Sequence, residues 1–291
     1  MYRIINKQIL ASDIKRIDVE APLIVNKVLP GQFVIVIPEE KGSWIPLSVI
    51  DADKRKNTIT LIFKESGEAT FHLGMMPIGD TIFSILGPLG NPATIEKYGV
   101  VVCAASGVAI ASILPVCRAL KEAGNKVLGV IGAKTKREIF LEAQMRLACN
   151  QLFLATEDAS YARKGKVSKV VEELLGKEQV DMVYAIGPVD MMKTISQLTK
   201  EENIKTRIQV YSNIHCGMGL CGSCRSKVEK KEVLSCLHGP EFDGHKVDFD
   251  YLKVRMNAAA KCRQPKDISV ARALQEPGGL VKMISGIFKE T

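Results

Sequence analysis

The chain has 291 residues, of which 46% are hydrophobic and 25% charged, with eight cysteines and a net charge of +8. This length exceeds that of a usual single domain and predicts two domains. Only 5% of the residues are aromatic and no basic run is interleaved with them, which argues against nucleic-acid binding. No apolar run has the roughly 18–20 residues of a membrane span, and the start, Met1 to Lys7, turns polar too soon for a signal peptide. We therefore expect a cytoplasmic protein without a membrane span.

Short β-rich runs fill the first hundred residues. Turn formers such as Pro30-Gly31 and Pro77-Ile-Gly79-Asp80 separate them. The expected strands are Tyr2 to Leu10, Ile14 to Glu20, Gly31 to Ile37, Ile45 to Asp51, Thr58 to Lys64 and Thr81 to Leu86. Closely spaced strands with almost no helix between them predict a small β-barrel or sandwich.

After Gly99 the pattern changes to strands that alternate with helices. The expected strands are Val100 to Ala104, Lys126 to Ile131, Gln151 to Ala155 and Met182 to Ile186. The expected helices are Ile113 to Ala123, Glu138 to Cys149, Val167 to Leu175 and Asp190 to Glu202. Unbroken apolar strands joined by helices are typical of a parallel sheet covered on both faces. The boundary between the two kinds of structure falls near residues 95 to 100.

Two turns of this α/β region could hold a nucleotide. The first, Ala104 to Ala109, lies between a strand and a helix, where a doubly wound fold binds pyrophosphate on backbone N–H groups. Pro115 suits the first helical turn if Ser112 is the N-cap. The second turn, Ile186 to Met192, follows a later strand at the same edge of the sheet.

Four cysteines cluster in a glycine-rich loop with the spacing C-x4-C-x2-C-x11-C, and they are Cys216, Cys221, Cys224 and Cys236. This is the plant-type [2Fe-2S] pattern. Structural zinc is the alternative, although zinc ribbons generally use two C-x2-C pairs and this loop has one. Glycines here permit positive φ angles and let backbone N–H groups approach the sulfides.

The remaining features allow structural interpretations. Cys103, Cys117 and Cys149 lie in apolar surroundings and are expected to be small buried hydrophobes. The segment His238 to His245 places two histidines and two acids after Cys236. A metal site there is conceivable, but solvated or packing histidines are the simpler interpretation.

A cluster passes single electrons whereas a hydride donor delivers two, and a flavin commonly converts between them. Three segments of the barrel could hold a flavin: Ile45 to Ser48, Glu65 to Thr70 and Gly87 to Pro92. For each segment taken alone, an ordinary turn of a β-barrel is the simpler interpretation.

The order of barrel, α/β region and cysteine loop resembles the FAD/[2Fe-2S] electron-transfer subunits of the ferredoxin:NADP reductase superfamily. The segments "PGQFV", "IPLS", "GPLGNP", "AIGPVDMMK" and "HGPEFDGHKVDFD" carry this resemblance over about residues 1 to 256. They are most similar to the small subunit of NADH-dependent ferredoxin:NADP oxidoreductase, also called sulfide dehydrogenase. The electron-transfer subunit of dihydroorotate dehydrogenase is related.

The resemblance implies a set of binding residues. It assigns FAD to Pro46, Leu47, Ser48, Ile62, Phe63, Lys64, Gly67, Ala69 and Thr70. It assigns NAD(H) to Ser106, Gly107, Val108, Gly187, Pro188 and Met191, and the cluster to the four loop cysteines. No side chain is expected to act as an acid or a base, because the role of the protein is to position the cofactors.

The chain departs from the family pattern at three places. Trp44, its only tryptophan, stands where the family usually has an arginine that pairs with FAD phosphate, so FAD would be held differently, for example by stacking. The glycine-rich nucleotide turn reads Ala105-Ser-Gly-Val-Ala109, which predicts weaker NAD(H) binding because each added Cβ obstructs the pyrophosphate. Cys216 stands where the bifurcating relatives commonly have aspartate, which predicts a shifted reduction potential.

The predicted fold is therefore a β-barrel FAD domain (1–97), an α/β doubly wound NAD(P)-binding domain (98–208), a [2Fe-2S] module (209–256) and a helical C-terminal extension for partner docking (257–291). The expected function is electron transfer between NAD(P)H, FAD and the cluster to a larger flavoprotein or iron–sulfur subunit, with ferredoxin reached through the complex. Two alternatives stay open. One is a wiring subunit without nucleotide turnover, and the other is the electron-transfer subunit of a dihydroorotate dehydrogenase.

Overall fold

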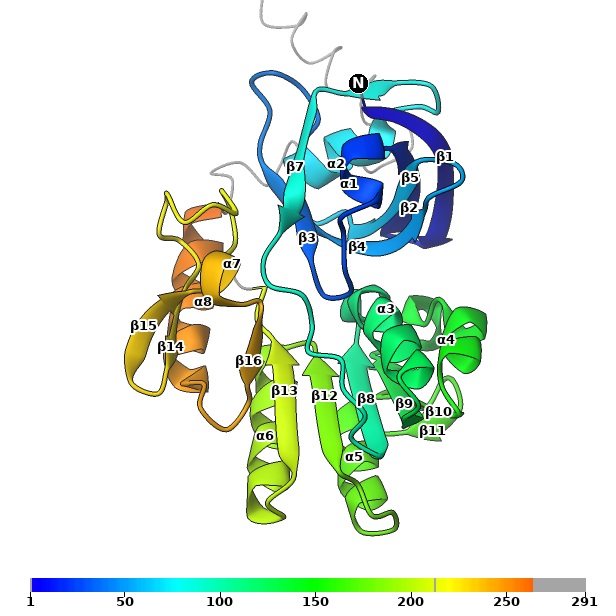
Figure 1. The fold of residues 1–291 in the computed structure, drawn as a ribbon, viewed down its shortest axis with the longest axis vertical. Coiled ribbons are helices and arrows are strands. Elements are labelled where there is room, and N and C mark those ends of the chain that lie inside the picture. Colours follow the sequence, from blue (N-terminus) through cyan, green and yellow to red (C-terminus); the bar gives the residue numbers. More distant parts are fainter. Residues whose placement is uncertain (1, 212, 264–291) are drawn as a thin grey trace, which may run out of the picture. The chain divides into compact units, whose positions relative to one another are not determined.

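The computed structural model describes residues 2–211 and 213–263, with side chains described up to residue 258. Its first part is a nearly closed antiparallel sheet in the order β6-β1-β2-β5-β4-β3-β7 (Figure 1). The strands are β1 (Tyr2–Ala11), β2 (Ile14–Glu20), β3 (Phe33–Ile37), β4 (Ile45–Asp53), β5 (Thr58–Lys64), β6 (Thr81–Ile82) and β7 (Ser84–Leu89). The predicted strands are confirmed, except that the last one is split into β6 and β7.

Strand β3 is buried along its whole length because both of its faces are covered. Val34 and Val36 point into the barrel core. Phe33, Ile35 and Ile37 point the other way, into a cluster that includes Cys224 and Cys236. Side chains alternate across a strand, so β3 is a wall with the barrel on one side and the cysteine loop on the other.

The barrel contains two helices that the sequence did not predict. The short α1 (Pro22–Val25) begins with a proline at its first position, which suits that place. The second, α2 (Glu68–Met75), starts in the segment that was expected to be only a polar turn. The Thr70 hydroxyl accepts the Gly67 N–H at 3.1 Å and donates to the Gly67 carbonyl at 2.9 Å, so it fixes the first turn of this helix.

The second part is a largely parallel sheet in the order β11-β10-β9-β8-β12-β13-β16, in which only β16 is antiparallel to its neighbour. Its strands are β8 (Val100–Ser106), β9 (Lys126–Ala133), β10 (Gln151–Thr156), β11 (Arg163–Lys164), β12 (Met182–Ile186), β13 (Lys205–Gln209) and β16 (Glu241–Asp243). The helices are α3 (Ala109–Glu122), η1 (Lys136–Glu138), α4 (Glu142–Ala148), α5 (Val167–Leu175) and α6 (Val189–Glu201). The predicted doubly wound architecture is confirmed.

Helices cover both faces of this sheet (Figure 1). Along β8, Val101, Cys103 and Ala105 pack with the α3 and α4 side chains. Val102 and Ala104 pack with the α5 and α6 side chains. A strand buried on both faces needs apolar residues at every position, which explains the unbroken run in the sequence.

Two helix predictions were wrong in detail. Helix α3 begins at Ala109, so Ser112 lies inside the helix and is not its cap, and Pro115 lies in the helix interior. The predicted helix from Glu138 to Cys149 is shorter. Its first half fails because Leu141 has a left-handed φ of 57°, a backbone conformation through which an α-helix cannot continue.

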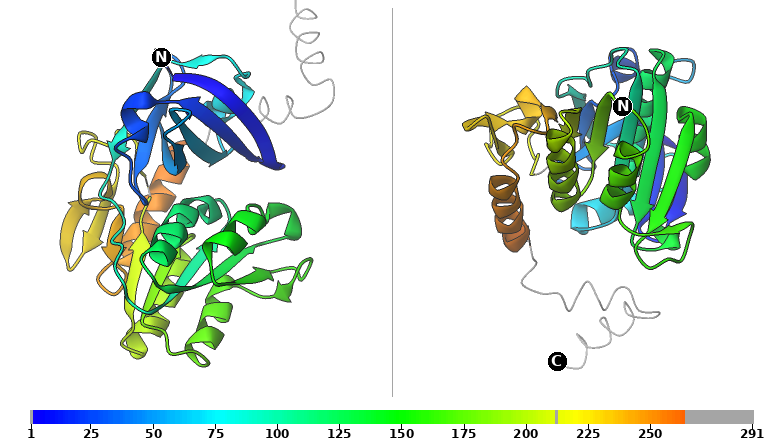
Figure 2. Two further views of the ribbon diagram at one scale, coloured as in Figure 1. Left: turned by 45° about the vertical axis from the view of Figure 1, so that its right-hand side comes forward. Right: turned by 90° about the horizontal axis from the view of Figure 1, so that it is seen from below.

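The cysteine-containing module follows β13. It consists of a hairpin, β14 (Arg225–Val228) with β15 (Lys231–Leu234), then the short α7 (Ser235–His238), β16, and helix α8 (Phe249–Arg263). Figure 2 shows the hairpin and the loop before it beside the barrel in both views. Within residues 2–263, no helix is both long and apolar enough to span a membrane. Most of the predicted helical C-terminal extension, from residue 264 to residue 291, lies outside the described residues.

Candidate functional site

The cysteine loop lies directly against barrel strands β3 and β7. An added Cβ on Gly217 would lie 2.7 Å from a Leu89 methyl and 2.9 Å from Ile35, and Gly217 has a φ of +72°. Both the space and the backbone conformation therefore require glycine at this position. Gly219 and Gly222 also have positive φ, at +77° and +63°. The expected role of these glycines is confirmed at the level of the backbone.

The four cysteines form two pairs. The Sγ atoms of Cys224 and Cys236 are 3.3 Å apart and buried. The backbone N–H of Cys221 donates to the Cys216 Sγ at 3.5 Å. A [2Fe-2S] cluster takes two cysteines on each of its two irons, and this pairing fits that requirement. In the part of the chain that the structure describes, no three Cys, His, Asp or Glu side chains surround a single metal position.

The two pairs differ in electrostatics. Burial tends to raise the pKa of Cys221, but hydrogen bonds from Ser223 and from the Cys216 backbone outweigh it and lower this pKa to about 6. Burial, followed by the neighbouring Cys224 thiol, raises the pKa of Cys236 to about 12. Bound metal holds cysteine as thiolate. The surroundings of Cys221 already favour that state, whereas Cys236 would be ionised by the metal itself.

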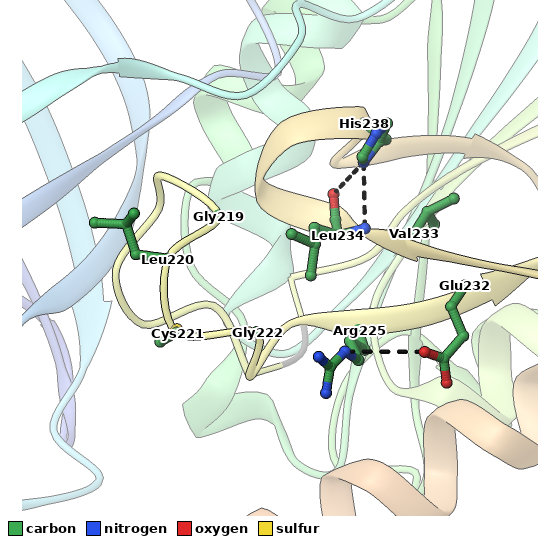
Figure 3. A pocket seen from close by; sticks show the side chains of 9 residues that line it. All are labelled: Gly219, Leu220, Cys221, Gly222, Arg225, Glu232, Val233, Leu234 and His238. Atoms are coloured by element: carbon green, nitrogen blue, oxygen red, sulfur yellow. Dashed lines mark hydrogen bonds and ion pairs between the residues drawn. The ribbon is translucent and has the colours of Figure 1, made fainter.

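The outer side of the loop is open to solvent. Cys221 is exposed, and the neighbouring Leu220 is 81% exposed. Figure 3 shows the shallow cavity, about 290 Å³, that lies between this loop and the β14–β15 hairpin. Arg225 and Glu232 form an ion pair on one side of it, and His238 bonds the Leu234 backbone on the other. A centre bound by these cysteines would therefore be close to the surface.

Strand β4 lies beside β3 in the same sheet and carries the first predicted flavin residues. Pro46 and Leu47 pair with Ile35 and Val34 of β3, and Ser48 pairs with Phe33. Leu47 points into the barrel core. Ser48 lies on the opposite face, where its Oγ accepts a hydrogen bond from the Ser112 Oγ of α3 at 2.9 Å. Ser48 is thus at the contact between the barrel and the α/β part.

The other predicted flavin residues lie on β5 and the start of α2. Ile62 packs in a cluster that also contains α3 side chains, whereas Phe63 points into the barrel core. Lys64 pairs with Asp13 at 2.9 Å. Gly67, Ala69 and Thr70 form the exposed or half-buried first turn of α2. The structure therefore puts Ser48 and Ile62 at the junction and Phe63 away from it.

The two predicted nucleotide turns lie next to each other at the carboxyl edge of the parallel sheet, because β8 and β12 are paired neighbours. An added Cβ on Gly187 would lie 2.6 Å from the Met191 Cε and 3.5 Å from the Ser106 nitrogen. Gly107 has a φ of +62°, and no other group crowds its α-carbon. Pro188 is the N-cap of α6. This is the edge at which open α/β sheets bind ligands.

The substitutions in the first turn act differently from one another. The side chain of Ala105 is fully buried in the core under α3 and does not face the edge. Val108 is 39% exposed at the turn itself. Ser106 and Ala109 are half-buried, so Val108 is the most exposed side chain of this turn.

Two groups at the junction were missed or misjudged from the sequence. The Trp44 ring stacks on His215, next to Cys216, with ring centroids 6.4 Å apart and an interplanar angle of 25°. Its predicted role in holding FAD gains no support from this contact. Tyr211 was not singled out, and Glu241 was considered only as one of the two acids in the segment His238 to His245, although both belong to a buried polar network. The only sign of this network in the sequence was the polar residues Arg207 and Gln209, which lie in a segment with a strand pattern.

Comparisons with known proteins agree with this geometry. Residues 212–248 match the iron-sulfur cluster binding domain of dihydroorotate dehydrogenase B. A Thermotoga maritima homologue of the dihydroorotate dehydrogenase B (NAD(+)) electron transfer subunit is 34% identical over 278 residues, which cover 96% of this chain and 97% of the relative. The corresponding subunit of Caldanaerobacter subterraneus subsp. tengcongensis is 33% identical and covers 76% of this chain and 87% of its own length.

Among solved structures, a chain of the NADH-dependent reduced ferredoxin-NADP oxidoreductase superposes with a TM-score of 0.87 at 34% identity, covering 94% of this chain and 98% of that one. These findings confirm the predicted role in electron transfer and the predicted cofactor set of FAD, a [2Fe-2S] cluster and NAD(H). The chain belongs to the family of dihydroorotate dehydrogenase B-type electron transfer subunits, within the ferredoxin:NADP reductase superfamily.

Proposed function

We propose that this subunit exchanges electrons between NAD(P)H and a larger redox subunit, through FAD at the barrel and a [2Fe-2S] cluster in the cysteine loop. The observation that carries this proposal is the shared wall of β3 and β4. Ser48 lies on β4, and Cys224 and Cys236 pack on Phe33 and Ile35 of β3. Ser48 and Phe33 are strand partners that point to the same outer face, so two cofactors side by side on this face would be close enough for electron transfer.

The side chains at the junction would hold FAD. Pro46, Ser48 and Ile62 line the side of the barrel that faces α3, and Gly67, Ala69 and Thr70 offer backbone and hydroxyl groups at the start of α2. The Leu47 and Phe63 side chains pack in the barrel core beneath the same strands, and Lys64 provides a positive charge. Bound FAD supplies the conversion between a two-electron hydride and single electrons.

The nucleotide would bind at the carboxyl edge of the parallel sheet. Ser106, Gly107 and Val108 form the turn into α3, in which the Gly107 N–H donates to the Gly132 carbonyl at 3.1 Å, and Gly187, Pro188 and Met191 line the neighbouring turn. Backbone N–H groups at a helix start favour a pyrophosphate. The residues position the nicotinamide and exclude water, and no acid or base is required of them.

The cluster ligands would be the four loop cysteines, with Cys216 and Cys221 on one iron and Cys224 and Cys236 on the other. The exposed edge at Leu220 and Cys221 would face the partner. The seven cysteines whose side chains the structure describes are all free thiols, which suits a reducing compartment such as the cytoplasm.

We assign the proposed parts as before: FAD domain 1–97, nucleotide domain 98–208, cluster module 209–256 and partner-docking extension 257–291. The partner is a larger flavoprotein or iron–sulfur subunit, with ferredoxin reached through the complex. Deleting residues 264–291 should then prevent assembly with that partner. Normal assembly of the truncated chain would remove the docking role.

The decisive experiment is anaerobic purification of the full chain together with its partners, followed by analysis of flavin, iron and zinc. The proposal expects one FAD and two irons per chain, and bleaching of the flavin absorption on titration with NADH. A colourless protein that contains zinc would overturn the cluster assignment. Visible absorption distinguishes the two metals directly, since zinc has no visible transitions.

A second candidate is a wiring subunit that keeps FAD and the cluster but has lost nucleotide turnover. It is favoured by Val108, whose side chain is partly exposed in the turn that would bind the pyrophosphate. In this case NADH would not bleach the flavin, whereas dithionite would reduce both centres. Substitution of Val108 by glycine should then restore a measurable NADH response. The mass of a co-purifying subunit distinguishes a dihydroorotate dehydrogenase from another partner.

A further inference from the structure

A chain of buried polar side chains crosses the junction, and the proposed function does not use it. It starts at the Glu241 carboxylate on β16, whose side chain is 6% exposed. Glu241 accepts hydrogen bonds from the Thr94 hydroxyl at 2.7 Å, the Thr94 N–H at 3.1 Å and the Tyr184 hydroxyl at 2.8 Å. A buried carboxylate with three donors is held in a single orientation.

The chain continues from Tyr184 toward the barrel. The Gln209 amide donates to the Tyr184 hydroxyl at 2.8 Å, and the Tyr211 hydroxyl contacts the Gln209 Oε1 at 2.8 Å. The same Tyr211 hydroxyl lies 3.0 Å from the Gly31 carbonyl of the barrel. An added Cβ on Gly31 would lie 2.7 Å from the Gln209 amide nitrogen, so the barrel leaves room for this amide.

The charges fix the direction of these bonds. Burial, and then the Glu241 carboxylate, raises the pKa of Tyr184 well above its ordinary value, so its phenol stays protonated and donates to Glu241. The Tyr184 oxygen can then accept from Gln209, and the Gln209 carbonyl is left free to accept from Tyr211. Arg207 lies 3.7 Å from Glu241 and provides the opposite charge.

Tyr211 is where this chain reaches the cofactor junction. Its ring meets Phe33 of β3 edge to face, with centroids 6.3 Å apart at 89°. It packs both with the cluster that contains Cys224 and Cys236 and with the one that joins the barrel to α3. Burial raises the pKa of Tyr211, and a hydrogen bond with the Ser48 hydroxyl opposes that rise.

We propose that Tyr211 is a positioning residue for the flavin: the chain from Glu241 through Tyr184 and Gln209 fixes its hydroxyl, which in turn orients Ser48. This inference rests on the proposed binding of FAD at Ser48. Ser48 accepts a hydrogen bond from Ser112 and is the strand partner of Phe33, on which the Tyr211 ring packs, so loss of the Tyr211 hydroxyl changes the polar surroundings of Ser48. The polarity at the flavin edge therefore depends on a carboxylate in the cluster module.

The test compares Tyr211→Phe with the wild-type subunit, both purified in complex with the partner. Phenylalanine keeps the ring that packs on Phe33 and removes only the hydroxyl. After addition of one electron per subunit, the ratio of reduced flavin to reduced cluster is measured by visible and electron paramagnetic resonance spectra. We expect this ratio to change about three- to tenfold, the effect of one neutral hydrogen bond.

Two further variants make the result specific. Glu241→Gln keeps the shape but turns an amide N–H₂ group toward one of the three donors, so we expect a change in the same direction as in Tyr211→Phe. Tyr161→Phe is the matched control, since Tyr161 also donates to a carboxylate, that of Glu142 at 3.0 Å, and belongs to no part of this chain. The control should leave the ratio unchanged.

The outcomes separate the two proposals. Loss of FAD from Tyr211→Phe with the cluster retained would support the positioning role, because FAD binding itself would then depend on the Tyr211 hydroxyl. A wild-type complex without FAD would overturn the proposed function and this inference together. A wild-type complex with FAD, in which Tyr211→Phe and Glu241→Gln both leave the ratio and the flavin spectrum unchanged, would overturn the inference alone.

Discussion

The chain holds two groups of cysteines that lie in opposite environments. Cys216, Cys221, Cys224 and Cys236 lie in a loop with glycines of positive φ and with N–H and hydroxyl donors. Cys103, Cys117 and Cys149 lie between β8, α3 and the end of α4, each at most 3% exposed. All seven are free thiols, so their chemistry is set by surroundings and not by residue type.

The pKa directions follow this contrast at Cys221 but not at the buried Cys236, whose pKa is raised to about 12. Hydrogen bonding with Cys103, together with burial, raises the pKa of Cys117 well above its ordinary value. Hydrogen bonding with Cys117, and then burial, also raises the pKa of Cys149. In the loop, by contrast, hydrogen bonds lower the pKa of the exposed Cys221 to about 6. The core group packs in the apolar interior, and the loop group is the one that we propose to bind metal.

The strongest test of the contrast removes one cysteine from each group. Cys224→Ala should abolish the visible cluster spectrum, because one iron loses half of its protein ligands. Cys117→Ala is the matched control, a buried cysteine of the other group, and should leave iron content and spectrum unchanged. Iron analysis and absorption of anaerobic samples check both. A full cluster in Cys224→Ala would remove this residue from the ligand set.

Alkylation of the metal-free protein gives the next largest difference. At neutral pH Cys221 is exposed and largely ionised, whereas the core thiols are reached only when the α/β part opens. We expect iodoacetamide to modify Cys221 at least about a hundredfold faster than Cys117. Peptide mass mapping over time resolves each site. Equal alkylation rates at Cys221 and Cys117 would mean that the core thiols are accessible and that the two groups of cysteines do not differ in this way.

The loop group could be singled out from the sequence because its information is local. Metal ligands come with fixed spacings and with glycines at the turns, and both can be read from the residues. The core group was predicted from apolar neighbours on one strand and one helix. The alternation of β8 side chains between the two helix layers then follows from the strand itself.

The junction could not be predicted in the same way. Tyr211, Gln209, Tyr184, Glu241 and Thr94 come from four separate segments, and only folding brings them together. Likewise Ser112 resembles a cap in the sequence, but the barrel supplies Ser48 as its partner and the helix starts earlier. Predictions from local sequence patterns fail where a side chain bonds to a residue that is distant in the sequence.

Gly217→Ala tests how tightly the loop group depends on its backbone. Alanine must adopt a φ of +72° and meets Leu89 at 2.7 Å, which should cost about 2–4 kcal/mol of stability in the loop region. We expect lower cluster content after purification and faster cluster loss on warming. Gly176→Ala is the control, since Gly176 ends α5 with negative φ and its added Cβ meets only atoms at 3.8 Å or more.

The smallest effect is expected from Cys117→Ser, which probes the core group by polarity at nearly constant size. The hydroxyl enters a fully buried apolar cluster, but it can donate to a carbonyl in the preceding turn of α3. The free energy of unfolding should therefore fall by only about 1–2 kcal/mol, measured by denaturant titration with Cys117→Ala as the size control. If Cys117→Ser left the free energy of unfolding unchanged, the core group of cysteines would not depend on apolar packing. If it instead altered the cluster spectrum, the two cysteine groups would be coupled and could no longer be treated as separate.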